Sequence, residues 1–331
     1  MKYIHIYETR ADYNAAEKEE YDMSLIVEED NFVVFKGPKQ FYEQYFTIES
    51  LTDNNTISVQ NVDCDIIPDL KYSNDFGNSW SSITITTGNS TIVTTINTGD
   101  KILFKGQNTN ISSAWNAYNK FSATGNFKVY GNALSLLYND KFVSNIEFPS
   151  SSNHNLSGLF YGTTTLTDAS DLILTPLTCK SNCYNGMFRE CTNLSVAPKL
   201  PATSPAEGCY SSMFEGCINL LEAPNINFTT TAKECCQRMF CMDRNSKITT
   251  PKMTKSPILR ATKGVTNCYK EMFKGNGNLV EVTCLMTSTF QCQDWLTNCS
   301  NTGTFYKASG ASWASNTNGI PSGWTTEIYS E

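Results

Sequence analysis

The side chains best suited to chemistry in this chain are its thirteen cysteines, twelve of which lie between Cys179 and Cys299. Because no histidine lies nearby, a zinc site would need four thiolates in closely spaced pairs. Cys179 and Cys183 are separated by three residues and Cys235 is followed by Cys236, but no further well-spaced pair completes a site. We therefore predict that the chain holds neither a metal nor another cofactor.

The cysteines also recur at fixed positions of an internal repeat. One repeat position holds Cys183, Cys209, Cys235 and Cys268, and a second holds Cys191 and Cys217. Such recurrence is typical of a buried row of small apolar side chains. We expect reduced thiols, with some disulfides or a bound metal as the alternatives. The N-terminus lacks the apolar stretch of a signal peptide, which argues against a planned disulfide framework.

No acid–base or nucleophilic constellation stands out in the sequence. Neither His5 nor His154 is placed to serve as the base that a serine or cysteine nucleophile needs. Glu190, Glu215 and Glu271 recur at repeat positions that we expect to face solvent. A glycan-degrading enzyme would need two carboxylates on a cleft, and we locate no such pair. We predict that the protein is not an enzyme and has no catalytic residues.

Two glycine-containing motifs are interpreted as turns. SNDFGNSW (Ser73–Trp80) matches the S-x-D-x-G-x-x-W pattern of an Asp box, a hairpin turn of sialidase propellers that lies away from their catalytic centre. A single copy without an arginine cluster predicts a folded hairpin rather than a sialidase. KGNGN (Lys274–Asn278) lacks the strand–loop–helix context of a phosphate-binding loop.

The tryptophans allow two interpretations. Trp115, Trp295, Trp313 and Trp324 could form a platform on which sugar rings stack. The alternative, which we favour, is that Trp313 and Trp324 cover the open end of a repeat array, because terminal repeats require a cap.

Composition argues against two classes of partner. The net charge is −7 and there are five arginines, so a groove that follows a nucleic-acid backbone would have too few cations. No run of 18 apolar residues occurs, so we predict no membrane-spanning segment. Charged residues make up 17% of the chain, below the roughly 25% of soluble proteins. Uncharged polar surfaces of this kind are common in extracellular, surface and virion proteins.

The elements that would position these residues fall into several stretches. Residues 1–60 carry five basic and twelve acidic side chains, so the other 271 residues are neutral overall. Within the acidic arm, residues 1–43, ADYNAAEKEEYD predicts a short helix or an extended segment, and NFVVFKG a strand beginning at Asn31. The arm is either a solvated leader or a segment that docks onto a partner. Residues 44–135 alternate apolar and polar residues between turn formers, which predicts an antiparallel β-sandwich or small barrel.

The chain from residue 136 onward repeats. CYNGMFRECTNLSVAP (183–198) recurs 26 residues later as CYSSMFEGCINLLEAP (209–224), then as CCQRMF (235–240) and, after a seven-residue insertion, as CYKEMFKGNGNL (268–279). Weaker copies are LFYGTTTLTDA (159–169) and DWLTNCSN (294–301). Spacings of 23 to 33 residues match those of leucine-rich repeats.

One repeat shows how the array would pack. Cys183, Met187 and Cys191 are spaced four residues apart, which predicts an apolar stripe on a short helix. Leu194–Ala197 predicts a short extended segment that Pro198 ends. Stacking would place the phenylalanine of each repeat on that of the next. We therefore predict a β/α solenoid over residues 136–302, with a C-terminal cap at 303–331. The third repeat reads FCMDRNSKITTP (240–251) and departs from the pattern.

The M-F-x-x-C-x-x-L-x-x-A-P pattern resembles the BspA-like leucine-rich repeats of surface proteins of Bacteroidota and of the phages that infect them. GTFYKASGASWASNTNGIPSGWT (303–325) resembles the tail that ends many such arrays, and LKYSNDFGNSW…TGDKILFKG…FKVYGNALSLLY resembles a β-module that often precedes them. The leader resembles an N-terminal segment of gut-phage virion proteins.

The resemblance implies a multidomain, non-enzymatic virion structural or fibre protein. Residues 1–43 would dock onto other virion proteins, a homotrimer is the expected stoichiometry, and the repeat array would contact host-surface polysaccharide or another protein. The expected location is the virion. The alternatives are an adhesin on the bacterial cell surface, which would need an export signal that we do not find in the sequence, and a glycan-degrading enzyme.

Overall fold

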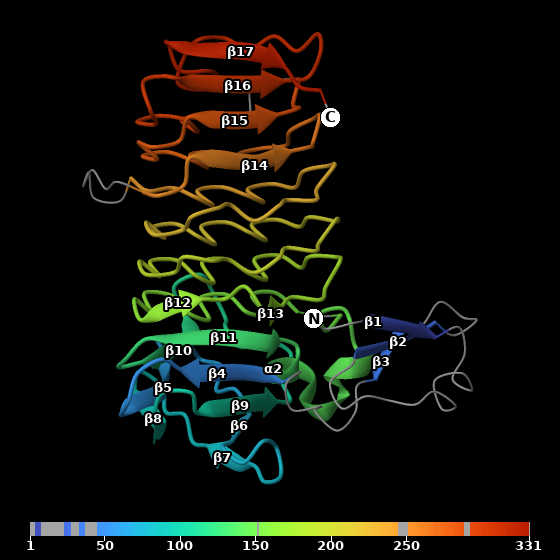
Figure 1. The fold of residues 1–331 in the computed structure, drawn as a ribbon, viewed down its shortest axis with the longest axis vertical. Coiled ribbons are helices and arrows are strands. Elements are labelled where there is room, and N and C mark those ends of the chain that lie inside the picture. The colour runs from blue at the N-terminus through green and yellow to red at the C-terminus, as the bar shows by residue number, and fades with distance from the viewer. Residues whose placement is uncertain are drawn as a thin grey trace.

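The computed structural model describes residues 45–150, 152–243, 251–287 and 292–330, together with three N-terminal strands (Figure 1). The described chain is mostly β-structure. Its helices are the single turn α2 (Ser135–Tyr138) and the 3-10 helix η2 (Asn139–Ser144). Sandwich-like sheets form the N-terminal part, and a β-solenoid forms the C-terminal part.

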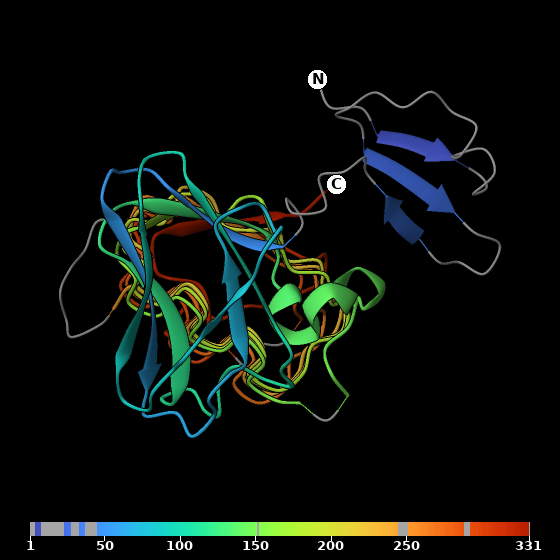
Figure 2. The ribbon, with the colours of Figure 1, turned by 90° about the horizontal axis from the view of Figure 1, so that it is seen from below.

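The N-terminal strands form a sheet of their own. β2 (Met23–Val27) lies between β1 (Ile4–Tyr7), to which it is parallel, and β3 (Val33–Lys36), to which it is antiparallel. The predicted strand beginning at Asn31 corresponds to β3, whereas ADYNAAEKEEYD lies outside the described residues. The sheet lies to one side of the main body, where β3 approaches η2 (Figure 2).

The β-module consists of two sheets. The larger has the order β11-β4-β9-β6-β7 and is extended at β11 by two strands of the solenoid, β12 (Leu166–Asp168) and β13 (Leu172–Ile173); the smaller has the order β10-β5-β8. The bounds are β4 (Phe46–Ser50), β5 (Asn55–Val62), β6 (Leu70–Ser73), β7 (Ser81–Ile83), β8 (Ser90–Ile96), β9 (Lys101–Gly106), β10 (Tyr118–Ala123) and β11 (Phe127–Asn132). All pairings among these strands are antiparallel, as predicted. In β5, buried residues alternate with partly exposed ones, which is the pattern of a strand with one face on a core.

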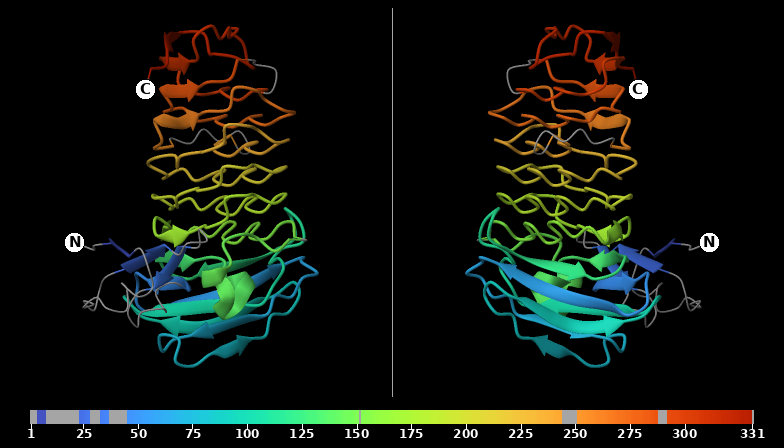
Figure 3. Two further views of the ribbon diagram at one scale, coloured as in Figure 1. Left: turned by 90° about the vertical axis from the view of Figure 1, so that its right-hand side faces the viewer. Right: turned by 90° about the vertical axis from the view of Figure 1, so that its left-hand side faces the viewer.

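The β-module and the solenoid share one core. β11 pairs in parallel with β12 (Leu166–Asp168) and β13 (Leu172–Ile173), which belong to the first coil. The ring of Phe160 in that coil lies 5.9 Å from Phe46 and 6.3 Å from Phe121. The β-module therefore covers the N-terminal end of the solenoid and continues its hydrophobic core (Figure 3).

The solenoid ends in a parallel sheet with the order β14-β15-β16-β17 (Figure 1). Its strands are β14 (Lys255–Leu259), β15 (Glu281–Cys284), β16 (Gly303–Lys307) and β17 (Trp324–Ile328). Successive strands come from successive coils, so each coil adds one strand. Inward residues such as Val282 and Phe305, which are partners in the register, are fully buried.

The predicted short helix in each repeat is wrong. Among the described residues of the array, the segment from Cys183 to Cys191 and its equivalents are chains of turns. The N–H of Cys183 donates to the carbonyl of Lys180, and the next N–H, that of Tyr184, donates across to Cys209 of the following coil. Because alternate N–H groups bond between coils, the i to i−4 bonds of an α-helix do not form. The solenoid is therefore a β-solenoid rather than β/α.

The predicted four-residue stripe is nevertheless buried. Asn182, Gly186 and Glu190 have φ of 54°, 58° and 60°, so a left-handed residue occurs every fourth position. This repeat of turns returns the side chains of Met187 and its equivalents to the same inward face. A spacing of four thus arises here from turns, although the sequence pattern is also that of a helix.

Phenylalanine stacking follows the prediction. Five phenylalanines from successive coils, Phe160, Phe188, Phe214, Phe240 and Phe273, stack with centroid distances of 5.4–5.6 Å and interplanar angles of 3–10°. All five are fully buried. The stack runs along the solenoid axis and sets the register between coils.

Candidate functional site

The cysteines of the repeat positions line the solenoid core. All thirteen are free thiols, and those at the two repeat positions are fully buried. Burial raises the pKa of Cys191 to about 12, because the thiolate would lose its hydration. Within the described ranges, no three His, Cys, Asp or Glu side chains are placed to hold a metal ion.

The second cysteine position has a hydrogen-bonding role that the sequence pattern did not reveal. The Sγ of Cys191 donates to the carbonyl of Phe160, 3.1 Å away in the preceding coil. Cys217 makes the equivalent bond to the Phe188 carbonyl at 3.0 Å. In the coil where asparagine replaces cysteine, the Nδ2 of Asn276 donates to the Phe240 carbonyl. In these three coils the position therefore holds a small side chain that donates a hydrogen bond to the preceding coil.

The prediction that the repeat carboxylates face solvent is wrong for Glu215, whose side chain is 0% exposed. Its Oε1 lies 3.0 Å from the Nη2 of Arg189 in the preceding coil and 3.0 Å from the Nη2 of Arg238 in the following coil. The arginines of both neighbouring coils thus pair with the buried Glu215 carboxylate. The sequence signal for this burial is Arg189, which occupies the same repeat position as Glu215 one coil earlier.

The charged side chains continue as a column along the solenoid. The guanidinium of Arg189 lies 5.4 Å from the ring centroid of Tyr161 in the first coil. At the other end, Arg238 pairs with Glu271, and Lys274 lies 3.7 Å from Glu271. Charges alternate in sign along this column: Arg238 lies between Glu215 and Glu271, and Lys274 lies between Glu271 and Asp243. The arrangement stabilises coil stacking and offers no free acid or base.

The Asp-box motif folds as the predicted hairpin turn. The Oδ1 of Asp75 accepts hydrogen bonds from the hydroxyl of Ser73 at 2.6 Å and from the N–H of Ser79 at 3.0 Å. These bonds stabilise the carboxylate and lower the pKa of Asp75 to about 2. The ring of Trp80 lies 4.1 Å from the ammonium of Lys105, so a buried cation covers one face of the indole. The motif therefore has a structural role.

Lys274–Asn278 also forms a turn, as predicted. Gly275 has a φ of 82°, and the Gly277 N–H donates to the Gly275 carbonyl at 3.0 Å. His154 begins the first coil, where burial lowers its pKa below the usual range. His5 lies in β1, in the separate N-terminal sheet.

The tryptophans do not form one platform. Trp295 is fully buried and stacks on Trp313 with centroids 5.3 Å apart, and the Nε1 of Trp324 donates to the Ser300 carbonyl at 2.8 Å. These three lie in the last coils, as expected for a cap. Trp115 is 60% exposed in the β-module, near the opposite end.

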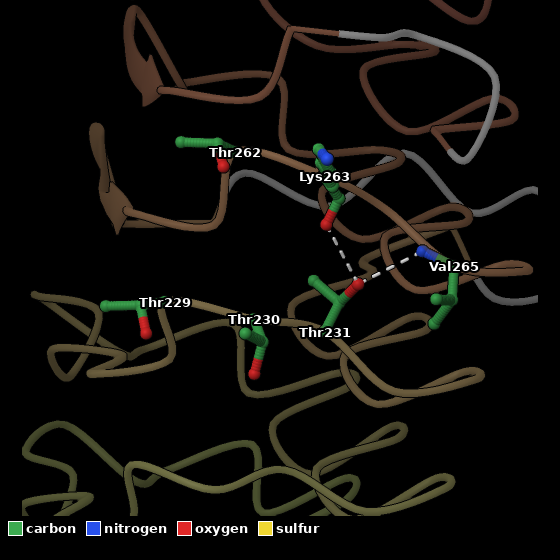
Figure 4. A pocket seen from close by; sticks show the side chains of 6 residues that line it. All are labelled: Thr229, Thr230, Thr231, Thr262, Lys263 and Val265. Carbon is green, nitrogen blue, oxygen red and sulfur yellow. Dashed lines mark hydrogen bonds between the residues drawn. The ribbon is translucent and has the colours of Figure 1, made fainter.

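A small, open groove lies on the flank of the solenoid (Figure 4). Its volume is about 220 Å³, and its lining residues come from two neighbouring coils. They are Thr229, Thr230, Thr231, Thr262, Lys263 and Val265. Sequence reasoning missed the groove, because threonines in a polar repeat carry no recognisable motif.

No helix in the described residues combines the length and apolarity needed to cross a membrane. A scan against family models, a search of curated proteins and a search of solved structures each gave no match for this chain.

Proposed function

We propose that the chain is a non-enzymatic structural protein of a phage virion, of the fibre type, whose repeat array is displayed for contact with host-surface polysaccharide or another protein. The observation that carries the proposal is the continuous aromatic stack. It runs from Phe46 in the β-module to Phe160, with rings 5.9 Å apart and 27° inclined, and on through the solenoid to Phe273.

A shared core of this kind supports a display role, because it makes the β-module and the repeats one rigid rod. Backbone hydrogen bonds link the two parts as well: the Phe121 N–H donates to Leu159 at 2.9 Å, and the Phe127 N–H to Thr165 at 3.1 Å. A spacer that bends would need a linker with few contacts across it. Here, contacts cross the junction in both backbone and side chains. A rod held at one end projects its far coils away from the attachment point.

The repeats are proposed to be a variant of the BspA-like leucine-rich repeat. Four residues of that pattern, Met213, Phe214, Cys217 and Leu220, are buried. The departure is local, since turns replace the expected helix between the cysteines.

Attachment is proposed to occur through residues 1–43. The three-stranded sheet of this arm is separate from the two sheets of the β-module, so docking there would leave the rod's core intact. The arm carries most of the protein's excess negative charge, which favours a partner with a basic surface. A homotrimer is the proposed assembly, and light scattering on the purified chain would measure it.

The test is mass spectrometry of purified phage particles, compared with surface fractions of the host bacterium. We expect the chain in the particles, at a copy number similar to that of other fibre proteins. Detection in host surface fractions alone would contradict the virion assignment and favour a bacterial adhesin.

A further inference from the structure

The groove on the solenoid flank arises where the repeat lengthens. Cys209 and Cys235 are 26 residues apart, whereas Cys235 and Cys268 are 33 apart. The two segments that line the groove, residues 229–231 and 262–265, occupy equivalent places before the cysteines of these successive coils. Within these described segments, the hydrogen bonds that join one coil to the other are made by a side chain rather than by paired backbones.

That side chain is Thr231, which fixes the width of the groove. Its hydroxyl donates to the Lys263 carbonyl at 3.2 Å and accepts from the Val265 N–H at 3.0 Å (Figure 4). The hydroxyl of Thr231 therefore uses its proton and one of its lone pairs in hydrogen bonds within the protein. The groove is therefore preformed, and Thr231 shapes it rather than offering a contact to a ligand.

The other side chains that line the groove are exposed and can contact a ligand. Thr229, Thr230 and Thr262 are exposed, and each hydroxyl can both donate and accept a hydrogen bond. Lys263 is exposed, and no described carboxylate forms an ion pair with it. Val265 is 43% exposed and supplies an apolar patch beside these polar groups.

We propose that this groove binds a single acidic sugar, a hexuronate residue of a polysaccharide. Sugar hydroxyls need partners that both donate and accept, which threonines provide, and the C–H face of a pyranose can lie on the methyl groups of Val265 and the threonines. The ammonium of Lys263 supplies the counter-charge for the carboxylate. The volume is below the roughly 300–1,000 Å³ of pockets for drug-sized ligands, which suits one sugar unit.

This assignment deepens the proposed display function and rests on it, since it names the ligand of the displayed array. The test uses the full chain and saturation-transfer NMR titrations with galacturonate and glucuronate, and with galactose and glucose as neutral counterparts. We expect a uronate to bind and the neutral sugars to bind at least about tenfold more weakly, the factor for loss of one charge-assisted hydrogen bond.

Lys263→Gln should reduce uronate affinity about tenfold while keeping the side-chain length. Thr230→Val should also weaken binding, because it keeps the shape and removes a hydroxyl. Lys199→Gln, at an exposed lysine outside the groove, is the matched control and should bind like the unchanged protein. Retention of full affinity by both groove variants, equal binding of neutral sugars, or no binding of any sugar would each overturn the proposal. Detection of the chain in particles would stand independently of these results.

Discussion

The thiol of Cys217 donates a hydrogen bond to the backbone carbonyl of Phe188 in the preceding coil, with Sγ and oxygen 3.0 Å apart. The same bond links Cys299 to Phe273 at 3.1 Å. A cysteine at this position therefore fills a small apolar space and gives the Phe188 carbonyl, which already accepts from the Cys191 N–H at 3.0 Å, a second donor. In both cases the accepting carbonyl belongs to a phenylalanine whose ring lies in the central stack.

The first prediction compares substitutions at Cys217. Cys217→Ala removes one of the two hydrogen bonds that the Phe188 carbonyl accepts, since the Cys191 N–H still donates to it at 3.0 Å, and should lower the free energy of unfolding by about 0.5–1.5 kcal/mol. Cys217→Ser keeps a donor and should lose less than alanine. Phe214→Ala removes a ring from the stack and should cost about 3–5 kcal/mol. Urea unfolding of the three variants gives the order, and equal losses for serine and alanine would show that the bond contributes nothing.

The second prediction concerns Glu215, which lies between Arg189 and Arg238. Glu215→Gln removes the anion and leaves two guanidinium groups facing each other across neighbouring coils. We expect the free energy of unfolding to fall by roughly 3 kcal/mol. This is the lower end of the range of about 3–5 kcal/mol for breaking a buried ion pair, because both arginines keep partial contact with water.

The matched control is Glu207→Gln. Glu207 pairs with Lys233 in the same kind of coil-to-coil contact, but the two side chains are 50% and 54% exposed. Surface pairs of this type contribute about 0–1 kcal/mol. Chemical denaturation of both variants measures the difference, and similar losses at the two sites would contradict the role assigned to burial.

The stacking of the repeats could be predicted from the sequence, but the backbone conformation within each repeat could not. Phe188 and Phe214 recur 26 residues apart, and this spacing predicted which residues of neighbouring coils lie on each other, because identical side chains at one period stack. The helix between the cysteines was a wrong prediction, since a four-residue apolar spacing fits both a helix and a chain of turns with a left-handed residue at every fourth position. Glu190 and Asn182 adopt the left-handed conformation although neither is glycine, so the residue types did not indicate a chain of turns. The burial of Glu215 depended on two arginines in other coils, which pattern analysis of one repeat does not consider.

The third prediction follows from the protonation of the core thiols. Burial raises the pKa of Cys191, Cys268 and Cys284 to about 12 from a usual value near 9. The folded state therefore holds protons that the unfolded chain releases. Stability should be full below pH 9 and fall as the pH rises from 9 towards 12. Thermal unfolding across this range measures the effect.

The same burial predicts slow chemistry at neutral pH. In the folded protein, Cys191 should react with iodoacetamide far more slowly than in urea, because the thiolate is scarce and covered. Reductant and chelator should leave the melting temperature unchanged. Rapid alkylation of the folded protein, or a melting temperature that falls with chelator, would contradict a core of protonated thiols.

The fourth prediction tests attachment through the N-terminal arm. The described core begins at Phe46, which is fully buried against Phe104 and Phe160, and the solenoid builds on it. Deletion of residues 1–40 removes none of these groups, so the β-module and repeats should fold with an unchanged unfolding transition. Incorporation into the particle or oligomer should be lost, because the arm would supply the docking contacts. Circular dichroism and calorimetry establish folding, and co-sedimentation with particles measures assembly. A deleted chain that assembles normally would place the attachment elsewhere on the rod, and the protein would then act as a free-standing binding module.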